Sequence, residues 1–344
     1  MTRSRQFTIP SLALALAAAV VAFAPASARA MHAAGQPGPG SLLTTAGGFS
    51  FSLGTSVGLV EGTASELAFY YPPPYGDKFK LSELTWDLKD VVMAGVHGSV
   101  GYGRWLRFNL GVWSALTEGN GMMVDRDWIY PDSVSAWLEP NDQNWTHESR
   151  HPDTSLDAGT IVDVNLSVLA LPAGPFSLRG IVGYKNDTWN WSARGGTYIY
   201  STEYPGSRDR TGSFPDGAEV ITYEQQYSIP YIGVGADWAW PAFRLESHLL
   251  FSPAVSASDS DYHALRGVLF EGEFSGGIYF GAGLNAVWSF SPHWSAALGV
   301  EYQTIPEITG DVTVSGTESG WFFADGGGIA LEALSVALGA AYRF

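Results

Sequence analysis

Residues 334–344 read LSVALGAAYRF, and their side chains alternate between apolar and mostly small or polar character. In an extended chain, every second side chain points to the same side. One face therefore carries Leu334, Val336, Leu338, Ala340, Tyr342 and Phe344, and the other carries Ser335, Ala337, Gly339, Ala341 and Arg343. This pattern predicts a β-strand with one face in an apolar environment. An edge strand of a soluble β-sandwich is the alternative.

The same alternation occurs further back in the chain. Leu106, Phe108, Leu110 and Val112 alternate with more polar or small residues, and residues 243–249 (FRLESHL) do the same. A polar lumen and a lipid-facing band require this pattern in a membrane barrel. A closed barrel also removes the unpaired backbone groups that lipid cannot accommodate. Together with the aromatic Phe344, these segments favour an outer-membrane barrel over a soluble sandwich.

We predict an all-β fold, a ten-stranded antiparallel transmembrane β-barrel. The expected strands are 48–70, 80–103, 104–116, 159–172, 176–198, 218–240, 243–257, 268–290, 294–315 and 331–344. The joins alternate between very short and longer ones. Bacterial barrels place short turns on the periplasmic side and long loops outside. Several strands exceed the ~9–11 residues needed to cross a bilayer, so the barrel should project beyond it.

The first residues are expected to be removed. Arg3 and Arg5 precede an apolar run, and Ala28-Arg29-Ala30 supplies small residues for cleavage. Residues 1–30 thus resemble a secretory signal peptide. An N-terminal membrane helix is the alternative, but the run is shorter than the ~20 apolar residues of a span. Residues 31–47 are predicted to be a flexible periplasmic lead-in, and 48–344 the barrel.

Charge and composition limit the possible partners. The net charge is −16, and it becomes −19 without residues 1–30, which contain three arginines and no acidic residue. Such a chain should attract cationic partners and not nucleic acid. The chain has no cysteine, which excludes disulfides, a thiol nucleophile and cysteine-ligated zinc.

Two short acidic segments are the natural places for chemistry. Asp125 and Asp127 should face together just above the third strand, and Asp259, Asp261 and His263 just above the seventh, all in surface loops. Neighbouring carboxylates hinder each other's ionisation, and a carboxylate orients an adjacent imidazole as a base. A water between the two groups could be activated. Solvated surface acids are the alternative interpretation.

Several stretches resemble the omptin family of outer-membrane aspartate/histidine proteases. The similarity runs from about Phe51 to Phe344. It is densest in NGMMVDRDW (120–128), ESRHPDT (148–154), SARGGTYIYS (192–201), GSFPDG (212–217), PYIG (230–233) and SDSDYH (258–263). The resemblance implies a ten-stranded barrel that cuts peptides, preferably between basic residues, at its extracellular mouth in the outer membrane.

The resemblance also implies roles for individual residues. The catalytic aspartate pair falls on Asp125 and Asp127, and the Asp–His dyad on Asp261 and His263. The pocket for the basic residue before the cut falls on Glu66 and Asp259. Ser149 and His151 match supporting positions. We therefore expect an endopeptidase that acts on cationic peptides or proteins after Arg or Lys. It would be a monomer in contact with outer-membrane lipid.

The sequence departs from the family's pattern in two places. His147 stands where several members carry Asp, which weakens the acidic subsite for the residue after the cut. Of the lipopolysaccharide-binding positions, Tyr184 matches, whereas Asn186, Thr188 and Gln226 replace charged groups. No cofactor is expected, and lipopolysaccharide binding is possible with a motif that is only partly kept.

Two other functions compete with this interpretation. Residues 147–151 (HESRH) match the HExxH zinc signature, which requires both histidines on one face of a helix. No helical periodicity surrounds the motif, and no third ligand is obvious, so we expect no metal. A catalytically passive barrel that acts as an adhesin or pore is the second rival.

Overall fold

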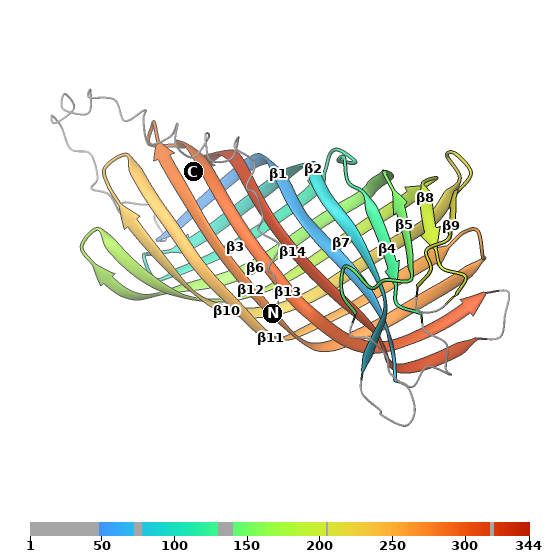
Figure 1. Ribbon diagram of the computed structural model, residues 1–344. Helices are drawn as coiled ribbons and strands as arrows, with labels where there is room; N and C mark the ends of the chain where they lie inside the picture. Colours follow the sequence, from blue (N-terminus) through green and yellow to red (C-terminus); the bar gives the residue numbers. More distant parts are fainter. Residues whose placement is uncertain (1–47, 72–77, 130–139, 204–205, 317–319) are drawn as a thin grey trace. The chain divides into compact units, whose positions relative to one another are not determined.

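We describe a computed structural model over residues 48–71, 78–129, 140–203, 206–316 and 320–344. The expected signal peptide and lead-in lie outside these residues. These residues form one compact unit of antiparallel strands joined by turns and loops (Figure 1). Among the described residues, no helix is long and apolar enough to cross a membrane.

Ten long strands close the barrel, as the sequence predicts. Hydrogen bonds join them in the order β1-β14-β13-β12-β11-β10-β7-β6-β3-β2, and β1 pairs with β2 to complete the ring. The strands are β1 (Phe49–Tyr70), β2 (Phe79–Tyr102), β3 (Leu106–Ala115), β6 (Asp153–Ala173), β7 (Phe176–Arg194), β10 (Glu219–Ala239), β11 (Phe243–His263), β12 (Val268–Ser289), β13 (Trp294–Gly316) and β14 (Trp321–Arg343).

Four short strands extend the sheet at one end. They are β4 (Met123–Asp127), β5 (His147–His151), β8 (Thr197–Tyr200) and β9 (Arg210–Ser213). They pair in sequence from β2 outward, and Figure 1 shows them together at the end of the barrel away from the C-terminus. We call this the loop end. The opposite, short-turn end carries the tight joins at 103–105, 174–175, 240–242 and 290–293.

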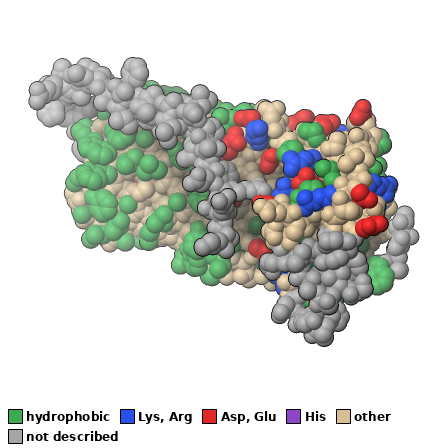
Figure 2. Space-filling model, in the orientation of Figure 1, with side chains coloured by type: hydrophobic (Ala, Val, Ile, Leu, Met, Phe, Trp, Pro, Cys, Tyr) green, Lys and Arg blue, Asp and Glu red, His purple; other side chains and the backbone are tan. Residues whose placement is uncertain are grey.

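The outer surface carries an apolar belt toward the short-turn end. Large apolar side chains such as Leu53, Val57, Leu59, Leu249 and Phe251 are exposed there, where a soluble protein would carry polar groups. Figure 2 shows these hydrophobic side chains gathered toward one end and the charged side chains toward the other. At 21 residues, β11 is about twice the ~9–11 residues of a membrane crossing. The strands therefore continue well beyond the belt at the loop end.

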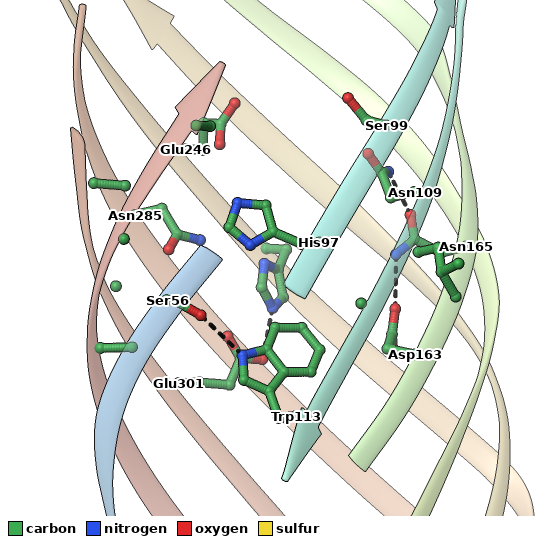
Figure 3. Close-up of a pocket in the computed structure, with 18 of the residues that line it drawn as sticks. Ser56, His97, Ser99, Asn109, Trp113, Asp163, Asn165, Glu246, Asn285 and Glu301 are labelled. Atoms are coloured by element: carbon green, nitrogen blue, oxygen red, sulfur yellow. Dashed lines mark hydrogen bonds and ion pairs between the residues drawn. The ribbon is translucent and has the colours of Figure 1, made fainter. Parts of the chain in front are cut away.

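The barrel interior has two regions. Toward the short-turn end lies a cavity of about 540 Å³, and the polar side chains that line part of it include His97, Asn109, Asp163 and Glu301 (Figure 3). Beyond it, toward the loop end, buried side chains pack into a core. The largest of these are Trp86, Trp189, Trp191, Tyr223 and Tyr227. This aromatic core fills the barrel between the cavity and the loop end.

The strand limits at the loop end differ from those predicted. β11 runs to His263 instead of ending at 257, β14 begins at Trp321 instead of 331, and β6 begins at Asp153 instead of 159. The sequence analysis also missed the four short strands. Beyond the belt both faces of a strand are polar or partly exposed, so the period-two pattern that reveals strands disappears there. The expected surface loops carrying the acidic segments are therefore strands.

Candidate active site

The Asp–His pair lies near the loop end of β11. His263 Nε2 is 2.6 Å from Asp261 Oδ2. Asp261 is only 2% exposed, no donor group among the described residues reaches its Oδ1, and its carboxyl shares a hydrogen bond with Glu66. Because residues 261 and 263 alternate on one strand, both side chains face the barrel interior. The carboxylate holds the imidazole, which leaves Nδ1 as the ring nitrogen that can take up a proton.

Arg266, in the turn between β11 and β12, hydrogen bonds to that second ring nitrogen, His263 Nδ1. A guanidinium can only donate, so Nδ1 must accept and Nε2 must carry the hydrogen that goes to Asp261. Arg266 therefore selects the tautomer of the imidazole. The contact also covers the nitrogen that would act as a base.

The aspartate pair lies on β4, which pairs with the loop end of β2. Asp125 is opposite Leu84 and Asp127 is opposite Ser82, and Ser82 Oγ donates to Asp125 Oδ1 at 3.3 Å. Burial raises the pKa of Asp125 well above its usual value, and the charges of Asp127 and Asp261 raise it further. Burial also raises the pKa of Asp127, against a lowering effect of Ser82 and nearby His147. The pair therefore tends to retain a proton.

The two predicted pocket acids lie within this charged neighbourhood. Glu66 on β1 is opposite Leu84, the same residue that Asp125 faces from the other side. Burial raises the pKa of Glu66 well above normal, and the charges of Asp261 and Asp259 add to the effect. Burial raises the pKa of Asp259 to about 7 against the hydrogen bond from Tyr223 Oη, which is 3.0 Å from Oδ2. Four carboxyl groups thus have raised pKa values in one region.

The predicted supporting residues lie on β5, the strand that pairs with β4. Ser149 is opposite Asp125, and His147 is opposite Asp127. Ser149 Oγ is 2.9 Å from His151 Nε2, and His151 Nδ1 is 2.6 Å from the carbonyl oxygen of Gly195. Since Nδ1–H must donate to that carbonyl, the Ser149 hydroxyl donates to Nε2. Ser149 and His151 are almost completely buried, at 3% and 0% exposure. Their hydrogen bonds therefore hold β5 against the turn between β7 and β8, where Gly195 lies.

The HExxH match does not form a zinc motif. Residues 147–151 are strand β5, not a helix. In a strand, positions four apart lie roughly 13 Å apart, too far for one zinc ion. Glu148 is held by Arg126 and Arg150, at 2.7 and 2.8 Å. Among the described residues, no three His, Asp or Glu side chains are grouped in a way that could hold a metal.

The positions expected to bind lipopolysaccharide lie on the neighbouring strands β7 and β10. Tyr184 is 43% exposed, and its hydroxyl is 2.9 Å from Ser228 Oγ. Asn186 donates to the carbonyl of Tyr227, and Thr188 is opposite Gln226. Tyr184 and Asn186 on β7 therefore bond to the neighbouring strand β10, and binding of this lipid stays a prediction.

Sequence reasoning missed three residues of the site. Ser82 contacts Asp125, Arg266 contacts His263, and the tilted rings of Tyr200 and His147 have centroids 5.0 Å apart. Burial raises the pKa of Tyr200 to about 12, so it stays a hydroxyl donor. Only Arg266 had a signal in the sequence, as a cation three residues after His263.

Comparison with known proteins gives a consistent result. The sequence profile of the Omptin family matches residues 48–344. Plasminogen activator from Yersinia pestis is 30% identical over 300 residues, covering 86% of this chain and 90% of that protein. Outer membrane protease OmpP from Escherichia coli (strain K12) is 29% identical, covering 75% of this chain and 78% of that protein.

A solved structure shows the same architecture. The crystal structure of outer membrane protease OmpT from Escherichia coli aligns with a TM-score of 0.78 at 25% identity, covering 86% of this chain and 97% of that one. The family profile extends over the whole barrel and all the site residues described above. The chain therefore belongs to the omptin family of outer membrane proteases.

Proposed function

We propose that this protein is an endopeptidase that cuts after Arg or Lys with a water activated by Asp261 and His263 opposite Asp125 and Asp127. The observation that carries the proposal is the 2.6 Å contact between His263 and Asp261 in a region of raised carboxyl pKa values. Family membership supports protease activity, and the geometry supports this particular set of residues.

In the proposed reaction, His263 Nδ1 takes a proton from water after Arg266 moves away. The resulting hydroxide attacks the scissile carbonyl carbon. A carboxyl that keeps its proton can donate a hydrogen bond to the developing oxyanion, and the raised pKa of Asp125 suits it to this role. The imidazolium then returns the proton to the leaving amine, and the peptide bond breaks.

The preference for a basic residue would come from Glu66 and Asp259. No donor group among the described residues reaches the buried Glu66 Oε2, and a hydrogen bond that Glu66 shares with the Asp261 carboxyl favours its protonated form. A buried carboxylate that lacks a partner is costly, and an incoming guanidinium or ammonium relieves that cost. A neutral side chain would leave the carboxyl groups unpaired. The net charge of −16 adds long-range attraction for cationic substrates.

The structure also bears on the rival function of a passive pore. The aromatic core of Trp86, Trp191 and Tyr223 occupies the interior between the cavity and the site. Stacked rings 5.2 Å apart join Trp86 to Tyr223. Such packing opposes free passage of solutes. A passive adhesin would need no buried carboxyl groups of this kind.

We further propose that the loop end faces the cell exterior and that residues 1–30 are removed on export. Short turns on the periplasmic side are the rule for bacterial barrels, and the site lies at the opposite end. Substrates would be cationic peptides or proteins, and the barrel would act as a monomer in outer-membrane lipid without a cofactor.

Cleavage of fluorogenic peptides by the refolded barrel tests the proposal. A peptide with Arg-Arg at the cut should be hydrolysed, and a matched peptide with Gln-Gln should not. Mass spectrometry of the products should place the cut after the first Arg. Equal cleavage of both peptides would contradict the basic preference, and cleavage of neither would contradict the proposed activity.

A further inference from the structure

An unusual row of apolar residues leads away from the Asp–His pair along the sheet. Strands β11, β12, β13 and β14 are neighbours. Asp261 is opposite Phe270, Phe270 is opposite Val314, and Val314 is opposite Trp321. Directly opposite residues of antiparallel strands share a face of the sheet. Phe270, Val314 and Trp321 therefore lie on the same interior face as Asp261.

A second row runs parallel to the first and starts at the predicted pocket. Asp259 is opposite Gly272, Gly272 is opposite Val312, and Val312 is opposite Phe323. Gly272 leaves room for the Asp259 carboxylate, because an added Cβ would lie 2.4 Å from its Oδ1. We call Phe270, Val312, Val314, Trp321 and Phe323 the apolar wall.

Side-chain contacts agree with the register. The rings of Phe270 and His263 have centroids 5.2 Å apart, so the wall begins in contact with the imidazole. A Cβ built on Gly327 would meet Val312 Cγ2 at 2.3 Å and the ring of Phe274 at 3.4 Å. Phe274 belongs to the buried core. Val312 therefore points to the interior face, and Phe323 opposite it does too.

The far end of this wall is exposed to solvent. Trp321 is 59% exposed and Phe323 is 47% exposed. Both lie near the loop end of β14, far from Leu338, which belongs to the apolar belt of the same strand. Lipid therefore does not account for their exposure. Aromatic side chains of this kind dominate binding energy when a partner covers them.

We propose that the apolar wall binds an aromatic or large aliphatic side chain of the peptide whose basic side chain enters the pocket of Glu66 and Asp259. The inference deepens the proposed function and rests on it. The apolar wall begins beside the Asp–His pair and the acidic pocket. Its occupant is therefore the substrate itself. The preferred substrate is then amphipathic, with one cationic and one apolar anchor.

The spacing of the two anchors follows from sheet geometry. Asp259 and Phe323 are separated by three strand-to-strand steps of ~4.8 Å, or roughly 14 Å. An extended peptide rises ~3.3 Å per residue. The apolar residue should therefore lie about four residues from the basic one. On the second row, Gly272 and Val312 leave only small side chains between the two anchors.

Two Arg-Arg peptides test the inference, one with a Trp about four residues from the cut and one with Ser there. Each peptide is made in two versions, one with the Trp or Ser before the cut and one with it after the cut. Wild type should prefer the Trp peptide about tenfold in kcat/KM on one side. Trp321→Ser with Phe323→Ser should lose this preference, with unchanged cleavage of the Ser peptide. Phe322→Ser is the matched control, since Phe322 is opposite Thr313 and faces outward.

Binding separates this inference from the proposed chemistry. Fluorescence anisotropy of labelled peptides with the His263→Ala barrel measures binding at the apolar wall in the absence of hydrolysis. Tighter binding of the Trp peptide that is lost only in the Trp321/Phe323 double variant supports the wall, whether or not the wild type cleaves. Equal affinity for both peptides, or equal loss in Phe322→Ser, would overturn it even if Arg-Arg cleavage is confirmed.

Discussion

Asp127 lies directly opposite His147 on the neighbouring strands β4 and β5. This places an imidazole beside one of the two aspartates that we assign to water activation. Thr146 Oγ1 lies 2.9 Å from His147 Nδ1, and the ring of Tyr200 lies against the imidazole at an interplanar angle of 54°. His147 therefore lies beside the candidate site, where the proposed function has it meet the residue after the cut.

His147→Asp should add a carboxylate at this position and strengthen the preference for Lys or Arg after the cut, by about threefold to tenfold in kcat/KM. A peptide library scored on both sides of the cut measures this. Prolonged chelation should leave wild-type activity unchanged, because β5 cannot form a helical zinc motif. Loss of activity under either treatment would show that the chemistry is assigned to the wrong residues.

Asp259 should make substrate capture depend on pH near neutrality. Its pKa is raised to about 7, so it is largely protonated at pH 6 and ionised at pH 8. KM for an Arg peptide should therefore fall as pH rises between these values. Asp259→Asn should flatten this dependence and raise KM at pH 8. If the pH dependence of KM is unchanged in the variant, Asp259 is not part of the pocket that binds the basic side chain.

The same carboxyl should lower stability at high pH. A carboxyl whose folded pKa lies above the unfolded value favours the folded state at low pH, and this contribution is lost as pH rises through the folded value. For Asp259 the window is from about 4 to about 7. Asp259→Asn should therefore raise Tm in detergent more at pH 8 than at pH 4. Equal shifts at both values would contradict the raised pKa.

Arg266 should restrain turnover, because its guanidinium occupies His263 Nδ1. Arg266→Met keeps much of the length of the side chain and removes the donor. We expect kcat on short peptides to rise about threefold to tenfold in this variant. Arg104→Met, a loss of the same charge at the short-turn end, is the control and should have no effect. A fall in kcat in Arg266→Met alone would mean that Arg266 assists the reaction.

The sequence predicted the order of the ten long strands because lipid imposes a strict alternation on them. It failed where that constraint ends. Residues 258–263 carry polar side chains on both faces, so β11 seemed to stop at 257, although Asp259, Asp261 and His263 continue the ladder to β10 and β12. The start of β14 was missed for a different reason: residues 321–330 (WFFADGGGIA) carry aromatic side chains on both faces and then three glycines, so no period-two pattern marks them.

The residues of the candidate site were proposed from the sequence one by one, and only the structure shows their geometry. Local spacing placed Asp125 beside Asp127 and Asp261 beside His263. It could not show that β4 and β11 face each other, since ring closure by β1 and β2 sets that relationship. Arg266 is a cation three residues after His263, but its contact with the imidazole depends on how the turn at 264–267 folds back, which this spacing alone does not specify.

The most direct test of the account is the turnover of His263→Ala on an Arg-Arg peptide, beside Ser149→Ala as a buried control and with heat-modifiable gel mobility as proof of folding. A positioned acid–base group contributes ~10²–10⁴-fold. We predict that kcat falls by that factor in His263→Ala and much less in Ser149→Ala. A folded His263→Ala barrel that keeps wild-type turnover would contradict the proposed mechanism.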